Sequence, residues 1–202
     1  MRFQLAATLR RMPPEDGDLS ALTPDEQVRF AASSKRQRTE LLAGRRAVRA
    51  LVQITKWCEW RGMETSECGR PRLRGCDNVD VSISHSQDWL LVAIATGRRV
   101  GVDVEVISAV FDQASLANRA CTAEELELVR AVGHDERRRW MADLWTTKEA
   151  ILKARGRGLM DDPRLVSISI SEAKAIRVHA PAAELSVAIA TLPWERELVH
   201  AA

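Results

Sequence analysis

The chain has 202 residues, 46% of them hydrophobic, and a net charge of +2 from 30 basic and 28 acidic residues. This length and composition suffice for one large domain or two small ones with a buried core, which excludes a disordered chain. The small net charge lacks the basic footprint of a nucleic-acid-binding protein, so we expect no nucleic-acid partner. The longest apolar run, residues 89–95, is far shorter than the roughly 20 residues of a membrane span. The N-terminal segment lacks the apolar core of a secretory signal, so we expect a cytoplasmic protein without a membrane partner.

Two helices are predicted in the first quarter of the chain. Residues 23–26 read Thr-Pro-Asp-Glu, in which a hydroxyl cap, proline at the first helical position and glutamate three residues after the cap predict a helix start. A longer helix is expected over about residues 35–57, where apolar residues recur at helical spacing. Its basic residues include Arg36, Arg38 and Arg45.

Strands are expected next, at about residues 80–84, 89–96 and 100–106. A capping box at residues 122–125 predicts a helix toward Val132. A further helix is expected over about residues 137–155, ended by the glycines that follow it, and the segment from Val166 onward is read mainly as strands.

Short strings recur in the same order in the two halves of the sequence. We interpret them as an ancient duplication, which predicts an α+β fold: a pseudo-dimer of two similar subdomains, each with helices packed on a small antiparallel sheet. The subdomains are expected at residues 1–98 and 99–202, with the ligand site in the cleft between them. The recurring strings are Pro-Arg-Leu at 71–73 and 163–165, Val-Ser-Ile-Ser at 81–84 and 166–169, and Val-Ala-Ile-Ala-Thr at 92–96 and 187–191.

The four cysteines are expected to be reduced thiols, because a chain of this size without a secretory signal does not depend on disulfides. They could in principle form two disulfides. Zinc binding by three of them with His85 is the other alternative, but their spacing matches no tight zinc knuckle. The cysteines are Cys58, Cys68, Cys76 and Cys121.

Every second residue of 100–106 is valine, and Asp103 and Glu105 lie two apart among the alternate residues. Side chains two apart in a strand share a face, so the two carboxylates project together, opposite Val102 and Val104. On a strand apolar enough to be central, this pair indicates a hard divalent cation such as Mg²⁺. The alternative is an exposed face with two solvated acids.

The predicted helix over residues 137–155 carries a lysine inside its apolar stripe. Lys148 falls among Leu144, Trp145, Ile151 and Leu152, and it therefore needs a partner or must extend its amine to solvent. On the adjoining face, Glu149 and Lys153 are spaced as an i, i+4 ion pair. An ordinary surface salt bridge would use the same spacing.

Residues 84–86, Ser-His-Ser, follow a predicted buried strand, and residues 69–71, Gly-Arg-Pro, form a turn with one projecting guanidinium. His85 can be a hydrogen-bonded structural residue or part of a site. Arg70 suits a phosphate or solvent equally. Serine hydrolase chemistry lacks support, because no glycine pattern of a nucleophile elbow surrounds any serine.

Taken together, these motifs resemble the Sfp-type 4′-phosphopantetheinyl transferases over about residues 20–170. The resemblance implies a pseudo-dimer of two α+β subdomains with coenzyme A bound between them, in agreement with the internal repeat. The motifs occur at residues 69–71 (Gly-Arg-Pro), 82–86 (Ser-Ile-Ser-His-Ser), 100–105 (Val-Gly-Val-Asp-Val-Glu), 145–153 (Trp-Thr-Thr-Lys-Glu-Ala-Ile-Leu-Lys) and 156–159 (Gly-Arg-Gly-Leu).

The resemblance also assigns roles to single residues. Mg²⁺ would be held by Asp103, Glu105 and Glu149, with Glu149 also the general base for the carrier serine. Lys153 would contact the pyrophosphate or the leaving group. Arg70 replaces a lysine that is frequent in the family, which keeps the charge but changes the contact geometry. The nucleotide and its phosphates would be held by Arg70, Ser84 and His85, less securely by Arg36, with Arg38 and Arg45 as neighbouring candidates.

The expected reaction transfers the 4′-phosphopantetheine group of coenzyme A to a serine of an acyl or peptidyl carrier protein, with Mg²⁺ neutralising the developing charge. A Mg²⁺-dependent phosphodiesterase or nucleotide hydrolase is the alternative reaction, and a non-catalytic module that binds coenzyme A or a carrier is the alternative class. Carrier docking is expected near residues 111–132, with Arg119 as a contact, and the protein is expected to be a monomer.

Overall fold

The computed structural model describes residues 2–66, 69–156, 162–166, 173–180 and 183–194. In the first half, strand β1 pairs with β5, and β5 pairs with β4, all antiparallel. The elements are β1 (Gln4–Arg11), α1 (Pro24–Ala31), α2 (Lys35–Thr55), β2 (Met63–Thr65), β3 (Pro71–Leu73), β4 (Val79–Ser86) and β5 (Trp89–Thr96).

The second half repeats this topology. Strand β6 pairs with β8, and β8 pairs with β7, again all antiparallel. The elements are β6 (Arg98–Val106), a 3₁₀ turn (Ala109–Asp112), α3 (Ala114–Ala120), α4 (Ala123–Ala131), α5 (His134–Arg155), a second 3₁₀ turn (Pro163–Leu165), β7 (Ala173–Ala180) and β8 (Ala183–Pro193).

In both halves the last strand lies at the centre of its sheet, between the strand that opens the half and the hairpin partner. The repeated string Val-Ala-Ile-Ala-Thr falls in β5 and in β8, the two central strands. The fold class predicted from the repeat is therefore confirmed. The second Val-Ser-Ile-Ser string lies almost wholly outside the described residues. The division at residues 98 and 99 stays a prediction.

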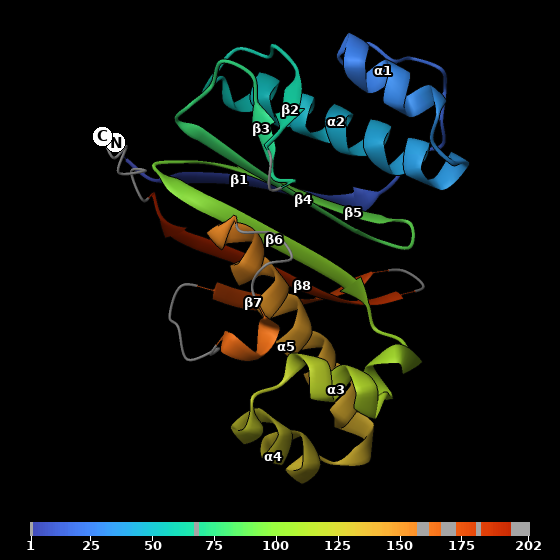
Figure 1. Ribbon diagram of the computed structural model, residues 1–202, viewed down its shortest axis with the longest axis vertical. Coiled ribbons are helices and arrows are strands. Elements are labelled where there is room, and N and C mark those ends of the chain that lie inside the picture. The colour runs from blue at the N-terminus through green and yellow to red at the C-terminus, as the bar shows by residue number, and fades with distance from the viewer. Residues whose placement is uncertain (1, 67–68, 157–161, 167–172, 181–182, 195–202) are drawn as a thin grey trace, which may run out of the picture.

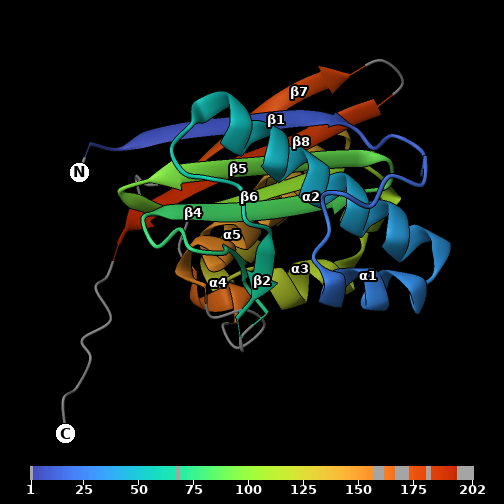
Figure 2. The ribbon, with the colours of Figure 1, turned by 90° about the horizontal axis from the view of Figure 1, so that it is seen from above.

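The elements form four layers: α2, the first sheet, the second sheet and α5 (Figure 1). Three apolar clusters fill the spaces between them. Leu90, Val92 and Ile94 of β5 pack with α2, whereas the alternate residues of β5 pack against β6 and β8. The apolar residues 150–152 and 154 of α5 pack on β8. Seen from above, α2 lies across the strands of the first sheet (Figure 2), so both faces of β5 are covered by apolar residues.

The alternation of β6 is the pattern that positions the site. Its valines 100, 102 and 104 are fully buried between the two sheets, so Gly101, Asp103 and Glu105 face the opposite side, where α5 lies. A Cβ built on Gly101 would lie only 1.9 Å from the carbonyl oxygen of Ala150. Glycine at this position therefore permits α5 to approach β6 closely enough for their side chains to meet.

The predicted helices are confirmed with small shifts at their ends. Capping boxes form at Thr23 and Thr122 as predicted. Helix α2 ends at Thr55 instead of residue 57. Strand β1 was not predicted, because its residues lack a clear alternation; most are exposed or half-buried at the edge of the sheet. Among the described residues, no helix combines the length and the apolar content needed to cross a bilayer.

The expectation of reduced cysteines is wrong for one pair. Cys58 and Cys76 form a disulfide, with their Cα atoms 6.3 Å apart, because the segment after α2 and the turn after β3 pack on the same apolar cluster. Cys121 is a buried free thiol, and Cys68 lies outside the described residues. The disulfide removes Cys58 and Cys76 from the ligand set that the zinc alternative requires.

Candidate active site

Asp103 lies between β4 and α5 and is only 4% exposed. Its Oδ1 accepts hydrogen bonds from the Ser84 hydroxyl at 2.7 Å and from the Lys153 ammonium at 2.6 Å. Its Oδ2 is buried without a hydrogen-bond partner among the described residues. Since buried carboxylate oxygens are normally paired, this oxygen is open to a positively charged ligand.

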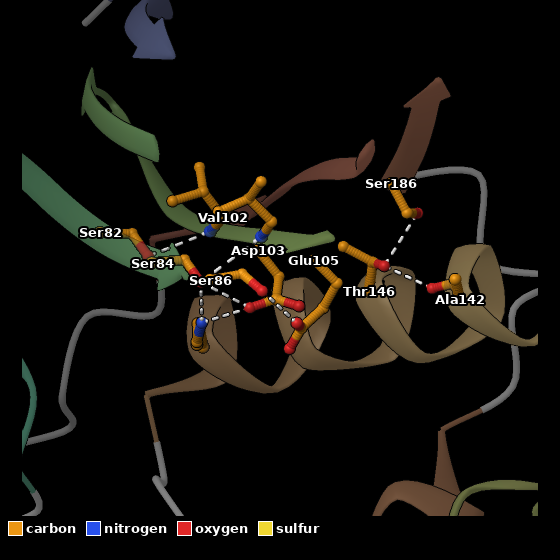
Figure 3. Close-up of polar contacts among 11 residues, drawn as sticks. Ser82, Ser84, Ser86, Val102, Asp103, Glu105, Ala142, Thr146 and Ser186 are labelled. Carbon is orange, nitrogen blue, oxygen red and sulfur yellow. Dashed lines mark hydrogen bonds and ion pairs between the residues drawn. The ribbon is translucent and has the colours of Figure 1, made fainter. Parts of the chain in front are cut away.

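Glu105 lies two residues further along the same face and is half-buried. Its Oε2 accepts a hydrogen bond of 2.7 Å from the Ser86 hydroxyl (Figure 3). Burial raises the pKa of Glu105, and the negative charge of Asp103 adds to the rise, while the bond from Ser86 lowers it. The two acids therefore repel each other in a partly desolvated setting, which a cation would relieve.

Glu149 approaches the same acids from α5. Burial is the largest cause of a raised pKa for Glu149, and the negative charge of Asp103 adds to the rise, while the charges of Lys153 and Arg119 oppose it. Its carboxylate accepts no hydrogen bond from the described residues. The predicted i, i+4 ion pair between Glu149 and Lys153 is wrong, because the Lys153 ammonium instead binds Asp103 and the Ser84 hydroxyl. Tertiary contact with β6 overrides the local helix pairing.

A buried ion pair holds α5 against the helix before it. Lys148 is 0% exposed and donates to the Glu125 carboxylate and to the carbonyl of Ala120. Glu125 also accepts from the backbone N–H of Thr122, completing the capping box of α4. The prediction that Lys148 needs a partner is confirmed. Its neighbour Glu149 is thereby fixed in rotation about the helix axis.

The three acids suit a hard cation in their chemistry. Carboxylate oxygens are the ligands that Mg²⁺ prefers, and the buried Asp103 Oδ2 lacks a partner. Burial and the negative charge of Asp103 raise the pKa values of Glu105 and Glu149, so a positive charge nearby would favour their ionised forms. The described acids are not already gathered into a metal-binding group; the Lys153 ammonium supplies the positive charge beside Asp103 instead. The donor set therefore fits Mg²⁺.

Two cavities adjoin each other next to strand β4. The larger, about 510 Å³, lies between α2 and β4 and is lined by Glu40, Arg45 and His85, among others. The smaller, about 200 Å³, is lined by Arg70 from the first half and by Lys153 from the second. Both cavities share Gly69, Pro71 and Ile83. Together they form a groove of ligand-binding size, and its lining includes Lys153, whose ammonium binds Asp103.

The predicted phosphate-binding residues differ in how far other protein groups already occupy their side chains. The guanidinium of Arg70 is 8% exposed and binds Asp80, the carbonyl of Val100 and the carbonyl of Lys153. It therefore joins the two halves of the chain besides lining the smaller cavity. Arg45 lines the larger cavity, but its Nε binds Glu26 at 2.6 Å in a buried ion pair.

His85 is accessible in the larger cavity, with Nε2 3.4 Å from Glu40. Ser84 is buried beneath Asp103, which it holds. The structure does not bring Arg36 and Arg38 to either cavity. Arg36 is 73% exposed and pairs with Glu40, and Arg38 pairs with Glu15 and lies over the ring of Phe30.

Two serines of the site, Ser82 and Ser86, lie outside the set of functional residues that the sequence predicts. Both are on the face of β4 that meets β6, and each accepts a hydrogen bond from a β6 backbone N–H. The signal is the alternation in residues 80–86, Asp-Val-Ser-Ile-Ser-His-Ser, which places four polar side chains on one face of a largely buried strand.

The second half of the chain matches a known protein family. The model of the 4′-phosphopantetheinyl transferase superfamily matches residues 99–201. The chain is 30% identical to the 4′-phosphopantetheinyl transferase HetI of Nostoc sp. over 131 residues, which cover 59% of this chain and 55% of the relative. It is 32% identical to AcpT of Escherichia coli K12 over 126 residues, 62% and 63% of the two chains. It is 25% identical to Sfp of Bacillus subtilis strain 168 over 117 residues, which cover 58% of this chain and 51% of the relative. The chain thus spans about half the length of several curated relatives that it matches.

Proposed function

Because the chain belongs to the 4′-phosphopantetheinyl transferase superfamily, we propose that it transfers the 4′-phosphopantetheine group of coenzyme A to a serine of an acyl or peptidyl carrier protein. The observation that carries this proposal is the position of Lys153. Its ammonium binds Asp103 and its side chain lines the smaller cavity, so the acids and the groove meet at one residue. A diphosphate that lies in the groove would therefore lie beside the acids.

In the proposed reaction the carrier hydroxyl attacks the phosphorus of the phosphopantetheine moiety. A serine O–P bond forms, the P–O bond to the nucleotide breaks, and 3′,5′-ADP leaves. Glu149 accepts the hydroxyl proton, a role that suits a carboxylate with a raised pKa and no hydrogen bond from the described residues. Lys153 stabilises the negative charge that develops on the bridging oxygen of the diphosphate, which leaves with 3′,5′-ADP, because its ammonium lies at the junction of the acids and the groove.

Asp103, Glu105 and Glu149 would hold Mg²⁺. When bound, the ion neutralises charge on the phosphoryl oxygens. Within the groove, His85 would contact the nucleotide end of coenzyme A, because it lines the larger cavity and its side chain is partly exposed. Arg70 would contribute positive potential to the smaller cavity while it remains bound to Asp80.

The carrier is proposed to dock on α3 and α4, close to Glu149. Arg119 of α3 lies over the ring of Trp145 at 5.6 Å, and its charge lowers the pKa of Glu149. An exposed arginine there can meet an acidic carrier helix. Arg119→Glu is expected to raise the Michaelis constant for the carrier about tenfold or more; an unchanged constant would contradict this docking site. A monomeric state and a cytoplasmic location stay predictions.

The direct test incubates the protein with apo carrier proteins, coenzyme A and Mg²⁺, and measures the carriers by mass spectrometry. We expect one 4′-phosphopantetheine group to be added to at least one carrier, with loss of the product when a chelator removes Mg²⁺. No mass increment across fatty-acid, polyketide and nonribosomal-peptide carriers would contradict the proposal. Cleavage of coenzyme A without a carrier would instead indicate a hydrolase.

Glu149→Gln separates catalysis from binding. The substitution keeps the shape of the side chain and removes the proton acceptor, so we expect transfer to be lost while coenzyme A still binds. If neither form is active and both bind coenzyme A equally, the protein is a binding module.

A further inference from the structure

Strands β4 and β6 belong to different sheets, yet they are joined by a regular set of hydrogen bonds. Figure 3 shows one of them, between Val102 and Ser82. Every second backbone N–H of β6 donates to a side chain on every second residue of β4, always twenty positions earlier. The polar side chains replace the backbone carbonyls that would accept these bonds in a continuous sheet. The pairs are Val100 with Asp80 Oδ2 at 2.7 Å, Val102 with Ser82 Oγ at 3.0 Å, Val104 with Ser84 Oγ at 3.4 Å and Val106 with Ser86 Oγ at 3.1 Å.

The direction of these bonds fixes the serine protons. A serine hydroxyl has one proton to donate and accepts at its oxygen. The β6 N–H groups occupy the oxygen, so each proton is available to an acceptor on the neighbouring residue of β6. Ser84 donates to Asp103 Oδ1 at 2.7 Å, and Ser86 donates to Glu105 Oε2 at 2.7 Å.

One oxygen of each acid is thereby held by β4, and the other is left for a further partner. For Asp103 that second oxygen, Oδ2, is buried and has no partner among the described residues. A carboxylate held at one oxygen loses rotational freedom before any ion arrives, which reduces the cost of ordering it on binding. Groups that hold metal ligands in this way commonly set the affinity of a metal site.

We propose that Ser84 and Ser86 are positioning residues, which orient Asp103 and Glu105 for Mg²⁺ by accepting from β6 and donating to the acids. The inference rests on the metal site of the proposed function. Ser86 gives the clearer test, because Ser84 also contacts the Lys153 ammonium. Ser82 is the matched control: it accepts from Val102 in the same manner but contacts no carboxylate among the described residues.

The experiment compares Ser86→Ala, Ser82→Ala and Ser86→Thr with the unsubstituted protein. The free proteins are titrated with Mg²⁺ in a calorimeter, without coenzyme A or carrier. We expect Ser86→Ala to bind Mg²⁺ about tenfold more weakly, Ser82→Ala to bind it as tightly as the unsubstituted protein, and Ser86→Thr, which keeps the hydroxyl, to restore most of the affinity. Thermal unfolding without Mg²⁺ should show a loss for both alanine variants, since each loses one bond to the β6 backbone, and a loss at least as large for Ser86→Ala, which also loses the bond to Glu105.

Equal Mg²⁺ affinity of Ser86→Ala and the unsubstituted protein would overturn the inference. An equal loss of affinity in both alanine variants would also overturn it, because it would indicate a purely structural role. So would the absence of Mg²⁺ binding to the unsubstituted protein. If Mg²⁺ binds and depends on Ser86 but no carrier is modified, the positioning role holds and the proposed transferase activity fails.

Discussion

Gly101 controls how closely α5 approaches the acids of β6, and Gly101→Ala tests this directly. A Cβ at this position would lie 1.9 Å from the carbonyl oxygen of Ala150 and 2.4 Å from the backbone nitrogen of Ala154. Both atoms belong to helix backbone, so no side-chain rotation can relieve the overlap. Ordinary contact begins at 3.4 Å, and α5 must therefore move away from β6 by about 1.5 Å.

The magnitude follows from this displacement. Overpacking a core commonly costs about 1–3 kcal/mol, and a backbone clash belongs at the upper end, so we expect a loss of about 3 kcal/mol. For a chain of this size that corresponds to a fall in melting temperature of about 6–12 °C. Because a misplacement of about 1 Å can reduce catalysis ~10²-fold, moving Glu149 and Lys153 away from Asp103 should reduce transfer by about that factor.

Thermal unfolding followed by circular dichroism measures the stability loss, and carrier modification below the melting temperature measures the activity loss. Gly44→Ala is the matched control for stability. A Cβ on Gly44 would lie 3.5 Å from Ile83, an ordinary contact, and alanine inside a helix is more favourable than glycine by about 0.5–1 kcal/mol. The control should therefore be as stable as the unsubstituted protein or more so. A Gly101→Ala variant that melts at the unsubstituted temperature would refute the close approach of α5 and β6.

Two further predictions concern the acids and the buried lysine. Lys148→Met leaves the Glu125 carboxylate buried without its cationic partner and should lower the free energy of unfolding by about 3–5 kcal/mol, measured by urea titration. Adding Glu125→Gln to this variant should recover most of the loss. If stability is not recovered, the broken ion pair is not the cause of the loss. Burial and Asp103 raise the pKa of Glu149 in the folded state, so ionising Glu149 reduces stability as the pH rises above the unfolded-state pKa of about 4.3. In Mg²⁺-free buffer at pH 8, the melting temperature of Glu149→Gln should therefore be higher than that of the unsubstituted protein, and at pH 4 the two melting temperatures should be nearly equal. A difference in melting temperature that does not depend on pH would contradict the raised pKa.

Local patterns predicted the elements that carry the acids. Strand periodicity places Asp103 and Glu105 on one face of β6 without reference to the rest of the fold, because side chains alternate in any strand. The burial of Lys148 followed from helical spacing in the same way. The partner of Lys148 did not, since Glu125 is 23 residues away and lies on a different helix.

Contacts between residues distant in the chain were beyond the reach of these patterns. The sequence suggests phosphate binding for Arg70 and Arg45, whereas tertiary packing pairs them with Asp80 and Glu26. In the same way, the hydroxyl of Ser84 holds Asp103 because β4 lies beside β6. Each of these partners is ten or more residues away in the chain, so only the packing of the sheets and α2 determines the pairing.

The measurement that tests the central claim most directly is anomalous diffraction from crystals of the protein grown with coenzyme A and Mn²⁺, which accepts oxygen ligands as Mg²⁺ does. The account predicts one strong anomalous peak bounded by the carboxylates of Asp103, Glu105 and Glu149, with the coenzyme A diphosphate beside it. A coenzyme A molecule bound in the groove without a peak between these three acids would contradict it.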